Sequence, residues 1–136
     1  MDADTSNQSS TAGRVLIVDD ERGIRELFSL IFANALPGVI IDVASNGAEA
    51  VELFRQHRHG VLTMDLNMPV MDGLTAFYEI SRMCENHSLA MPSVVFCTGY
   101  APPDAIRKIV RGPGQHLLLS KPVKSEVLVE AIQSRL

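Results

Sequence analysis

One stretch decides the fold of this chain: Gly60-Val61-Leu62-Thr63-Met64-Asp65-Leu66-Asn67-Met68-Pro69-Val70-Met71-Asp72-Gly73. It begins as a short apolar run of strand length, ends on Asp65 and passes at once into a loop that contains Pro69. A carboxylate at the end of a buried strand costs free energy unless something uses it. Asp65 is therefore the first candidate functional residue.

Two other apolar runs end in charged residues. Asp19-Asp20 follows Val15–Val18, and Lys121 comes soon after Leu117–Leu119. Two acidic positions and one cation at the ends of three strands predict a metal-dependent phosphate site.

Composition limits the class of protein. A length of 136 residues fits one compact domain, and 46% hydrophobic residues argue against a disordered or fibrous chain. A net charge of -4 without a Lys/Arg cluster argues against nucleic-acid binding. The apolar runs are too short to cross a membrane, and the N-terminus lacks the pattern of a signal peptide. We therefore expect a cytoplasmic protein that binds neither nucleic acid nor membrane. Cys84 and Cys97 make no disulfide framework and are expected to be reduced, structural thiols.

Strand and helix patterns alternate along the chain. Residues 1–13 are polar and aperiodic, which predicts a disordered arm before one domain over residues 14–136. Expected strands are 14–19, 39–44, 60–65, 93–98 and 115–120, and expected helices are 21–35, 46–58, 72 to about 84, a short one from Pro103 to before Gly112, and 124–136. In the first helix, the apolar spacing predicts a face of Ile24, Leu27, Phe28, Ile31 and Ala35.

This alternation predicts an α/β fold with a parallel five-stranded sheet and helices on both faces. In such sheets, ligands bind beyond the carboxyl ends of the strands. Five candidate residues lie at those ends, namely Asp19, Asp20, Asp65, Thr98 and Lys121.

These residue types suit phosphoryl transfer. Asp20 and Asp65 held close together would repel, and Mg²⁺ would relieve that repulsion through oxygen ligands. One oxygen of Asp65 could then attack phosphorus and form an acyl phosphate. Lys121 and the Thr98 hydroxyl could hold other phosphoryl oxygens.

Each residue alone has a simpler explanation. Asp19-Asp20 could open a helix, Asp72 could cap one, Thr98 could be an ordinary strand-end hydroxyl, and Lys121 could be a solvated loop lysine. Their joint placement at strand ends is what favours a site.

The same residues carry a family likeness. The chain resembles the receiver domain of two-component response regulators over about residues 14–136. The motifs are Val15-Leu16-Ile17-Val18-Asp19-Asp20-Glu21, the stretch from Met64 to Gly73, Thr98-Gly99 and Lys121-Pro122-Val123, with Asn46-Gly47-Ala48-Glu49-Ala50 also similar.

The resemblance implies a flavodoxin-like, doubly wound fold of strand order 2-1-3-4-5. It implies that Asp65 accepts a phosphoryl group from a sensor histidine kinase or a histidine phosphotransfer protein. Asp20, Asp65 and the Asn67 carbonyl would bind Mg²⁺, with Asp19 helping through water. Thr98 would close on the phosphoryl group, Lys121 would pair with it, and the Lys121-Pro122 peptide would be cis.

Two positions bear on how such a domain would work. Where relatives often carry a Tyr or Phe three residues before the lysine, this chain has Leu118, so coupling to the outer surface could be altered, weakened or carried elsewhere. Tyr100, two residues after Thr98, either shields the phosphoryl group from water or simply packs on its loop.

The other candidates have structural explanations. His57 and His59 are expected at a helix C-terminus, and His116 is expected on the surface. Met64, Met68 and Met71 are expected to pack in the core and loop rather than bind a metal.

Three functions remain in competition. The leading one is a phosphorylation-controlled switch, not an enzyme, whose output passes through protein contacts of the last two helices and the strand between them. It would serve an unknown downstream protein, as a stand-alone domain, a relay shuttle or part of a larger regulator, and a weak homodimer stays open. The second is a receiver-like scaffold that works without phosphorylation. The third is a haloacid-dehalogenase-like phosphatase, which would want an acid where this chain has Asn67.

Overall fold

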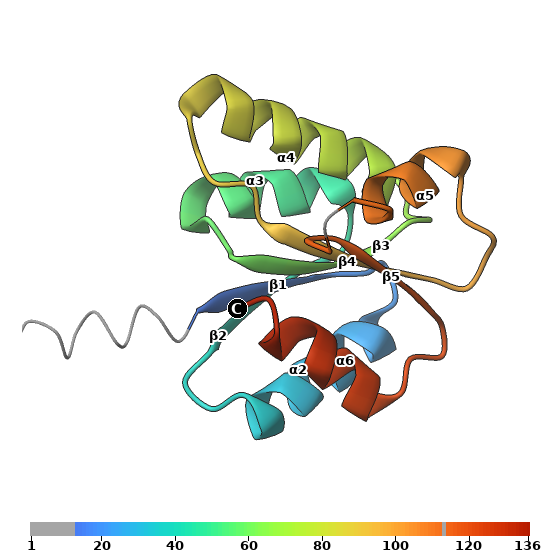
Figure 1. Cartoon of the computed structure of the whole chain (residues 1–136). Helices are drawn as coiled ribbons and strands as arrows, with labels where there is room; N and C mark the ends of the chain where they lie inside the picture. Colours follow the sequence, from blue (N-terminus) through green and yellow to red (C-terminus); the bar gives the residue numbers. More distant parts are fainter. Residues whose placement is uncertain (1–12, 113) are drawn as a thin grey trace, which may run out of the picture.

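A computed structural model describes residues 13–112 and 114–136 of the chain. The arm expected over residues 1–13 lies, apart from Gly13, outside the described residues, as does Pro113. Five parallel strands form one sheet of order β2-β1-β3-β4-β5 (Figure 1). The predicted doubly wound α/β fold and its strand order are confirmed.

Strand and helix alternate without exception in the described residues. The strands are β1 (Arg14–Val18), β2 (Ile40–Ala44), β3 (Val61–Asp65), β4 (Ser93–Thr98) and β5 (Leu117–Ser120). The helices are α2 (Arg22–Ala35), α3 (Gly47–His57), α4 (Gly73–His87), α5 (Asp104–Val110) and α6 (Ser125–Gln133).

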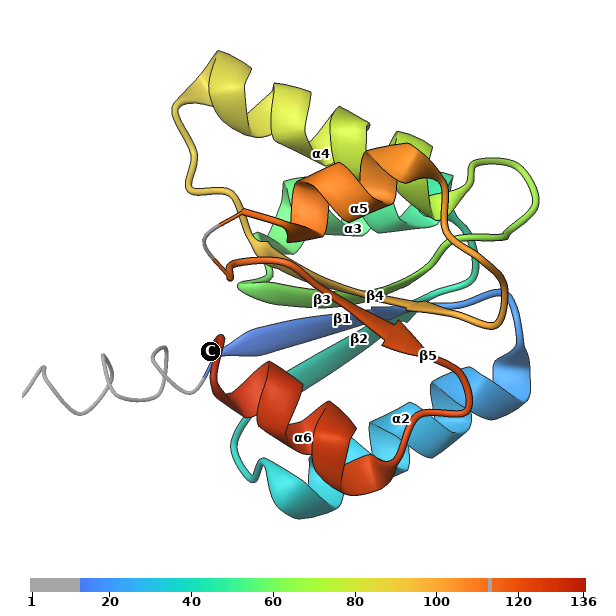
Figure 2. The ribbon, with the colours of Figure 1, turned by 45° about the vertical axis from the view of Figure 1, so that its right-hand side comes forward.

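Helices cover both faces of the sheet. Helices α3, α4 and α5 lie on one face, and α2 and α6 lie on the other (Figures 1 and 2). Each layer has its own core, because side chains alternate between the two faces of a strand. From β1, Leu16 and Val18 pack on the first side, whereas Val15 and Ile17 pack on the second. The central strands β1, β3 and β4 are almost wholly buried, which explains their continuous apolar runs.

The buried face of α2 differs from the prediction. Phe28 and Phe32 are its buried residues, whereas Leu27 is 50% exposed and Ala35 is also exposed. Phe32 lies four residues after Phe28 and therefore extends the same stripe, which places Leu27 on the flank of the helix. The prediction that Leu27 and Ala35 face the core is wrong.

Two helix ends also differ from the prediction. Helix α4 runs on to His87, beyond the expected end near Cys84, and α6 ends at Gln133 rather than at the end of the chain. Ser88, in the left-handed conformation, provides the C-cap of α4, a stop that carries no Gly or Pro for sequence reasoning to find.

Side-chain caps fix the starts of α3 and α4. The Asn46 side chain accepts a hydrogen bond from the Glu49 N–H at 2.9 Å, and Asp72 accepts one from the Thr75 N–H at 2.8 Å. The capping role expected for Asp72 is confirmed. Cys84 and Cys97 are free and buried, as expected. Burial raises the pKa of the Cys97 thiol to about 12, which keeps it protonated and unreactive.

His59 takes part in a charged network that the sequence did not reveal. Its buried ring contacts the carboxylate of Asp42 through Nε2 at 2.7 Å, and Arg14 Nε donates to the same carboxylate oxygen at 2.7 Å. Burial lowers the pKa of His59, against the influence of Asp42. Burial acts to raise the pKa of Asp42, but the hydrogen bonds from Arg14 and His59 outweigh it and lower that pKa.

His116 is not a surface histidine, and that prediction is wrong. It is partly buried, accepts a hydrogen bond from the Val94 N–H through Nδ1 at 3.0 Å and meets the Phe77 ring edge-on. Met64, Met68 and Met71 pack with the α3–α4 core, as expected. Among the described residues, no helix is both long enough and apolar enough to span a membrane.

Val70 is a strained residue in the loop between β3 and α4. It has a φ of 71°, in the left-handed region, and its side chain is 83% exposed. A β-branched side chain fits this conformation poorly, whereas asparagine tolerates it. Little packing at this exposed position offsets the strain.

We predict that Val70→Asn stabilises the protein by about 1 kcal/mol. The thermal midpoint should rise by roughly 3 °C, measured by circular dichroism. Val43→Asn is the matched control, because Val43 is an exposed valine of β2 that is not among the residues with positive φ. That control should be neutral or destabilising, since asparagine disfavours strands. A loss of stability in Val70→Asn would show that the loop needs the valine side chain.

Candidate active site

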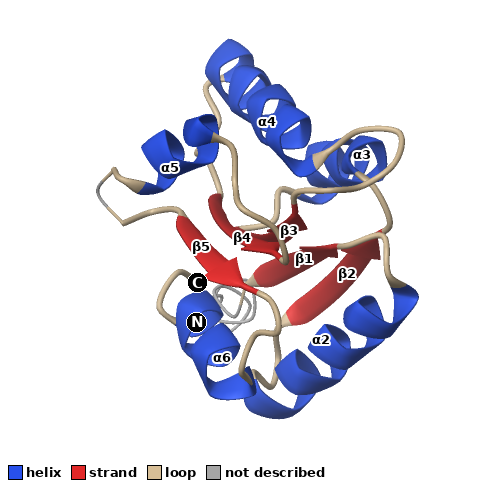
Figure 3. Ribbon diagram, turned by 90° about the vertical axis from the view of Figure 1, so that its right-hand side faces the viewer, coloured by secondary structure: helices blue, strands red, loops and turns tan. Residues whose placement is uncertain are grey.

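Strand pairing brings the predicted residues to one edge of the sheet. Figure 3 looks onto this edge, where the carboxyl ends of the strands lie. In the register, Val18 is the partner of Met64, so the next residues, Asp19 and Asp65, come side by side. Thr98 is the partner of Ser120 in the same way, which puts Lys121 just beyond β5.

Three carboxylates form the centre of the site. Asp19, Asp20 and Asp65 each offer an oxygen within 4.8 Å of the others. Asp19 and Asp65 are buried, whereas Asp20 is exposed. Asp19 is held in place by its own surroundings: its Oδ1 accepts a hydrogen bond from the Glu21 N–H, and its carbonyl accepts one from Arg25.

Lys121 supplies the nearest positive charge. Its Nζ lies 2.8 Å from Asp19 Oδ2 and 3.6 Å from Asp65 Oδ1, with Glu21 at 3.9 Å. Burial of the ammonium group acts to lower its pKa, but the hydrogen bond and charge of Asp19, with the charge of Asp65, raise it. Lys121 is therefore charged and bound to Asp19 first, with Asp65 as its second partner.

Asp65 remains short of positive charge. Burial, followed by the charge of Asp19, raises the pKa of Asp65 to about 6, against the opposing influence of Lys121. A buried carboxylate whose ionised form is this costly favours a bound cation. The available atoms are carboxylate oxygens, which suit a hard divalent ion such as Mg²⁺.

The remaining predicted residues surround this cluster. The Asn67 N–H contacts Asp65 Oδ1 at 3.5 Å, and the Thr98 hydroxyl accepts a hydrogen bond from the Tyr100 N–H at 3.2 Å. The Thr98 carbonyl accepts a hydrogen bond from the Lys121 N–H, which ties the end of β4 to the segment after β5. The Lys121-Pro122 peptide is cis, as expected.

A cavity of about 420 Å³ opens above Asp65. It is lined by Asp20, Glu21, Asp65, Asn67, Gly99, Tyr100 and Lys121. Thr98 is buried behind this wall and does not line it. The sequence analysis did not identify Glu21 or Arg25 as residues of the site. Their spacing of one helical turn at the start of α2 was the signal that could have indicated them.

Gly73 allows α4 to begin close beside Asp65. A Cβ atom at residue 73 would lie 2.2 Å from the Asp65 carbonyl oxygen, so a side chain there would displace the backbone of the site. The Gly73 N–H donates to the Leu66 carbonyl at 3.1 Å, which closes the loop between β3 and α4. Asp72 therefore caps α4, and Gly73 lets the start of that helix lie close to the backbone of Asp65.

Because Asp65 has too little positive charge around it, replacing its carboxylate should raise the free energy of unfolding. Because the pKa of Asp65 in the folded protein, about 6, exceeds its ordinary value of 3.8, ionisation of Asp65 costs stability as the pH rises through 6. At pH 8 without divalent ions, Asp65→Asn should therefore be more stable by roughly 1–3 kcal/mol.

Urea unfolding at pH 4 and pH 8 measures this difference. The gain should largely vanish at pH 4, where Asp65 is mostly protonated, and Mg²⁺ should stabilise the wild type more than the variant. The control is Asp104→Asn at the start of α5, where the carboxylate is exposed and should not show this dependence. Equal stability of the wild type and Asp65→Asn at pH 8 would show that ionised Asp65 does not destabilise the fold.

Known proteins are similar to this chain in sequence and in fold. The family model for the response regulator receiver domain matches residues 15–133. The chain is 30% identical over 125 residues to the chemotaxis protein CheY of Bacillus subtilis, covering 92% of this chain and 98% of that protein. It is also 40% identical over 93 residues to a protein-glutamate methylesterase/protein-glutamine glutaminase of Aliivibrio fischeri, covering 68% of this chain. It spans only about 25% of the length of that enzyme.

A solved structure agrees with these sequence matches. The CheX-CheY-BeF3-Mg²⁺ complex from Borrelia burgdorferi contains a chain with a TM-score of 0.73 and 26% identity, covering 90% of this chain and 87% of that one. The chain belongs to the response regulator receiver domain family.

Proposed function

We propose that this domain is a phosphorylation-controlled switch whose phosphoacceptor is Asp65. The observation that carries the proposal is the cluster of Asp19, Asp20 and Asp65 beside Lys121 at the carboxyl edge of the sheet, where Asp20, Asp65 and Lys121 line one cavity. Membership of the receiver family supports the same role.

Mg²⁺ fits the residues present. Asp20 and Asp65 would bind it directly together with the Asn67 carbonyl, and Asp19 would help through water. Bound there, the ion supplies charge neutralisation for the phosphoryl oxygens. The pKa of Asp65, about 6, leaves this carboxylate mainly ionised at neutral pH, as a nucleophile must be.

The residues of the chain then have separate tasks. A carboxylate oxygen of Asp65 forms the new bond to phosphorus as the bond from phosphorus to the donor nitrogen of a phosphohistidine breaks. Lys121, 3.6 Å from Asp65, needs only a small movement to pair with the phosphoryl group. Thr98 carries its hydroxyl at the end of β4 and would turn toward the phosphoryl group, giving up the hydrogen bond from Tyr100.

Protein contacts would supply the input and the output. A sensor histidine kinase or histidine phosphotransfer protein would donate the phosphoryl group. The output surface would be α5, β5 and α6, because Thr98 and Lys121 adjoin this part of the fold. The CheX-CheY-BeF3-Mg²⁺ complex from Borrelia burgdorferi supports a function through contact with a protein partner. The match to the methylesterase covers a quarter of that enzyme and does not extend its activity to this proposal.

Two other functions make different predictions. A scaffold that works without phosphorylation would bind its partner equally well as wild type and as Asp65→Asn. This alternative rests on Leu118, which is partly buried against the core beneath α3 and α4 and stands where relatives often carry an aromatic residue. A haloacid-dehalogenase-like phosphatase would turn over a generic phosphate ester, but its second acid is replaced by Asn67 here.

The direct test uses Mg²⁺ with beryllium fluoride as a phosphoryl mimic. Amide NMR shifts of the wild type should spread from Asp65 through Thr98 to residues 104–112 and 114–120, because the mimic biases the α5–β5 region. Asp65→Asn should not respond, whereas Asp104→Asn should respond like the wild type. Shifts confined to the cavity would mean that the site binds but Leu118 does not transmit, and no shifts would favour the scaffold.

Tyr100 should lengthen the life of the phosphorylated state. Its side chain is 74% exposed and lines the cavity beside Asp65, where it can obstruct water. We predict that Tyr100→Ala hydrolyses its aspartyl phosphate severalfold faster, timed after phosphorylation by a small phosphodonor. Tyr78→Ala, at an exposed tyrosine of α4, should keep the wild-type rate. An unchanged lifetime in Tyr100→Ala would assign the ring to loop packing alone.

A further inference from the structure

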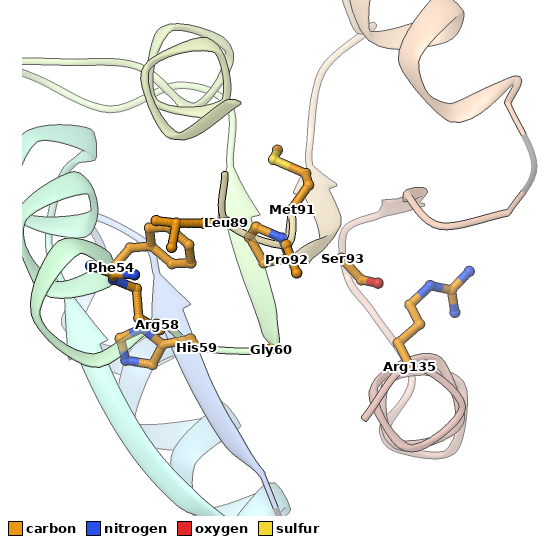
Figure 4. A pocket seen from close by; sticks show the side chains of 10 residues that line it. Phe54, Arg58, His59, Gly60, Leu89, Met91, Pro92, Ser93 and Arg135 are labelled. Atoms are coloured by element: carbon orange, nitrogen blue, oxygen red, sulfur yellow. The ribbon is translucent and has the colours of Figure 1, made fainter. Parts of the chain in front are cut away.

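A second cavity opens at the opposite edge of the sheet. It has a volume of about 370 Å³ and lies at the amino ends of β3 and β4 (Figure 4). Its lining residues, here called the basal pocket, are Phe54, Arg58, His59, Gly60, Leu89, Ala90, Met91, Pro92, Ser93 and Arg135. The basal pocket shares no lining residue with the cavity above Asp65.

The chemistry of the basal pocket is amphipathic and basic. Phe54, Leu89, Met91 and Pro92 provide an apolar part of the wall. The lining contains two arginines and no acidic residue, although the whole chain carries a net charge of -4. A hollow of this size with apolar walls and a few polar groups is typical of small-molecule sites.

The two arginines differ in what they can offer a ligand. Arg135 is occupied: its guanidinium group donates to the carbonyls of Gly114, Gln115 and Ala131. In Figure 4 its side chain extends away from the rest of the lining residues. Arg58 is exposed, and only its Nε has a partner in the described part of the chain, the Arg55 carbonyl at 3.0 Å. The terminal nitrogens of Arg58 therefore remain available to an anion.

His59 supports this wall from behind, with no exposed side-chain surface. Its Nε2 is held by Asp42 at 2.7 Å, which sets the orientation of the ring. Its buried Nδ1 has no hydrogen-bond partner among the described residues. Because Nε2 faces a carboxylate and carries the ring proton, Nδ1 is an acceptor, and the fully buried ring takes no part in binding an anion.

We propose that the basal pocket binds a small organic anion: an apolar body seated against Leu89 and Met91, the partly exposed apolar residues of the lining, with a carboxylate paired to Arg58. A carboxylate matches the planar guanidinium group in two parallel hydrogen bonds. This site is separate from phosphorylation and does not depend on the function proposed for Asp65.

The test uses 4-phenylbutanoate as the probe and its neutral amide as a charge-free partner. At constant ionic strength, the carboxylate should shift the amide signals of Gly60, Leu89 and Ser93 in a saturable manner. A Kd on the order of 1 mM is expected for a ligand of this size. The amide should bind roughly tenfold more weakly, because it lacks the charge-assisted hydrogen bonds.

Two variants separate the charge from the cavity. Arg58→Gln should weaken the carboxylate to the level of the amide and leave amide binding unchanged. Gly60→Leu should abolish binding of both probes, because a Cβ at residue 60 meets no atom within 4 Å and the side chain can fill the hollow. Arg111→Gln, at an exposed arginine outside the lining, is the control and should bind like the wild type.

Several results would overturn the proposal. Absence of saturable shifts at residues 58–60 and 89–93 would do so, as would equal affinity for carboxylate and amide. Unchanged carboxylate binding in Arg58→Gln would reject the assigned anion contact. Thermal unfolding of Gly60→Leu verifies that this variant is folded, and Arg58→Gln, changed only at an exposed side chain, tests the proposal independently of it.

Discussion

The repulsion between Asp19 and Asp65 is the constraint on which the rest of the site depends. Parallel pairing of β1 with β3 places these two residues side by side, and the apolar layers around the strands keep both of them from water. Lys121 reduces the repulsion but binds Asp19 more closely than Asp65. Burial and this repulsion together raise the pKa of Asp65 to about 6.

The sequence predicted this edge of the sheet well because the constraint is local to strand ends. Regular alternation of strand and helix predicts a parallel sheet, and residues that directly follow buried runs then lie at its carboxyl end; the strand order was implied by the resemblance to receiver domains. Asp65, Thr98 and Lys121 could be placed by this reasoning alone. It could not show that Lys121 pairs more closely with Asp19 than with Asp65. That preference depends on the distances from Lys121 Nζ to the two carboxylates, 2.8 and 3.6 Å, which the sequence pattern does not give.

The wrong predictions share a physical cause. Leu27 fits a helical spacing, but only the packing of α6 and the sheet decides which part of a wide apolar stripe is buried. The charged network of His59 was not predicted, and His116 was predicted on the surface, because sequence alone cannot separate an exposed ring from a buried one near the end of a helix or strand. Their partners, Asp42 and the Val94 N–H, are 17 and 22 residues away along the chain. Such polar contacts between distant residues carry no periodic signal.

Two aspartates of the sheet differ in how their charge is satisfied. In the middle of β2, Asp42 receives hydrogen bonds from Arg14 and His59, which lie at the amino ends of β1 and β3, and its pKa is lowered. At the carboxyl edge, burial and the charge of Asp19 outweigh Lys121, which lies 3.6 Å from Asp65, and the pKa of Asp65 is raised. A carboxylate satisfied within the protein stabilises the fold and has little left to offer a ligand. A carboxylate left short of positive charge costs stability until a cation arrives. Asp42 and Asp65 therefore differ in burial, because their side chains are 22% and 7% exposed, and also in their partners, and both differences act on their pKa values in the same direction.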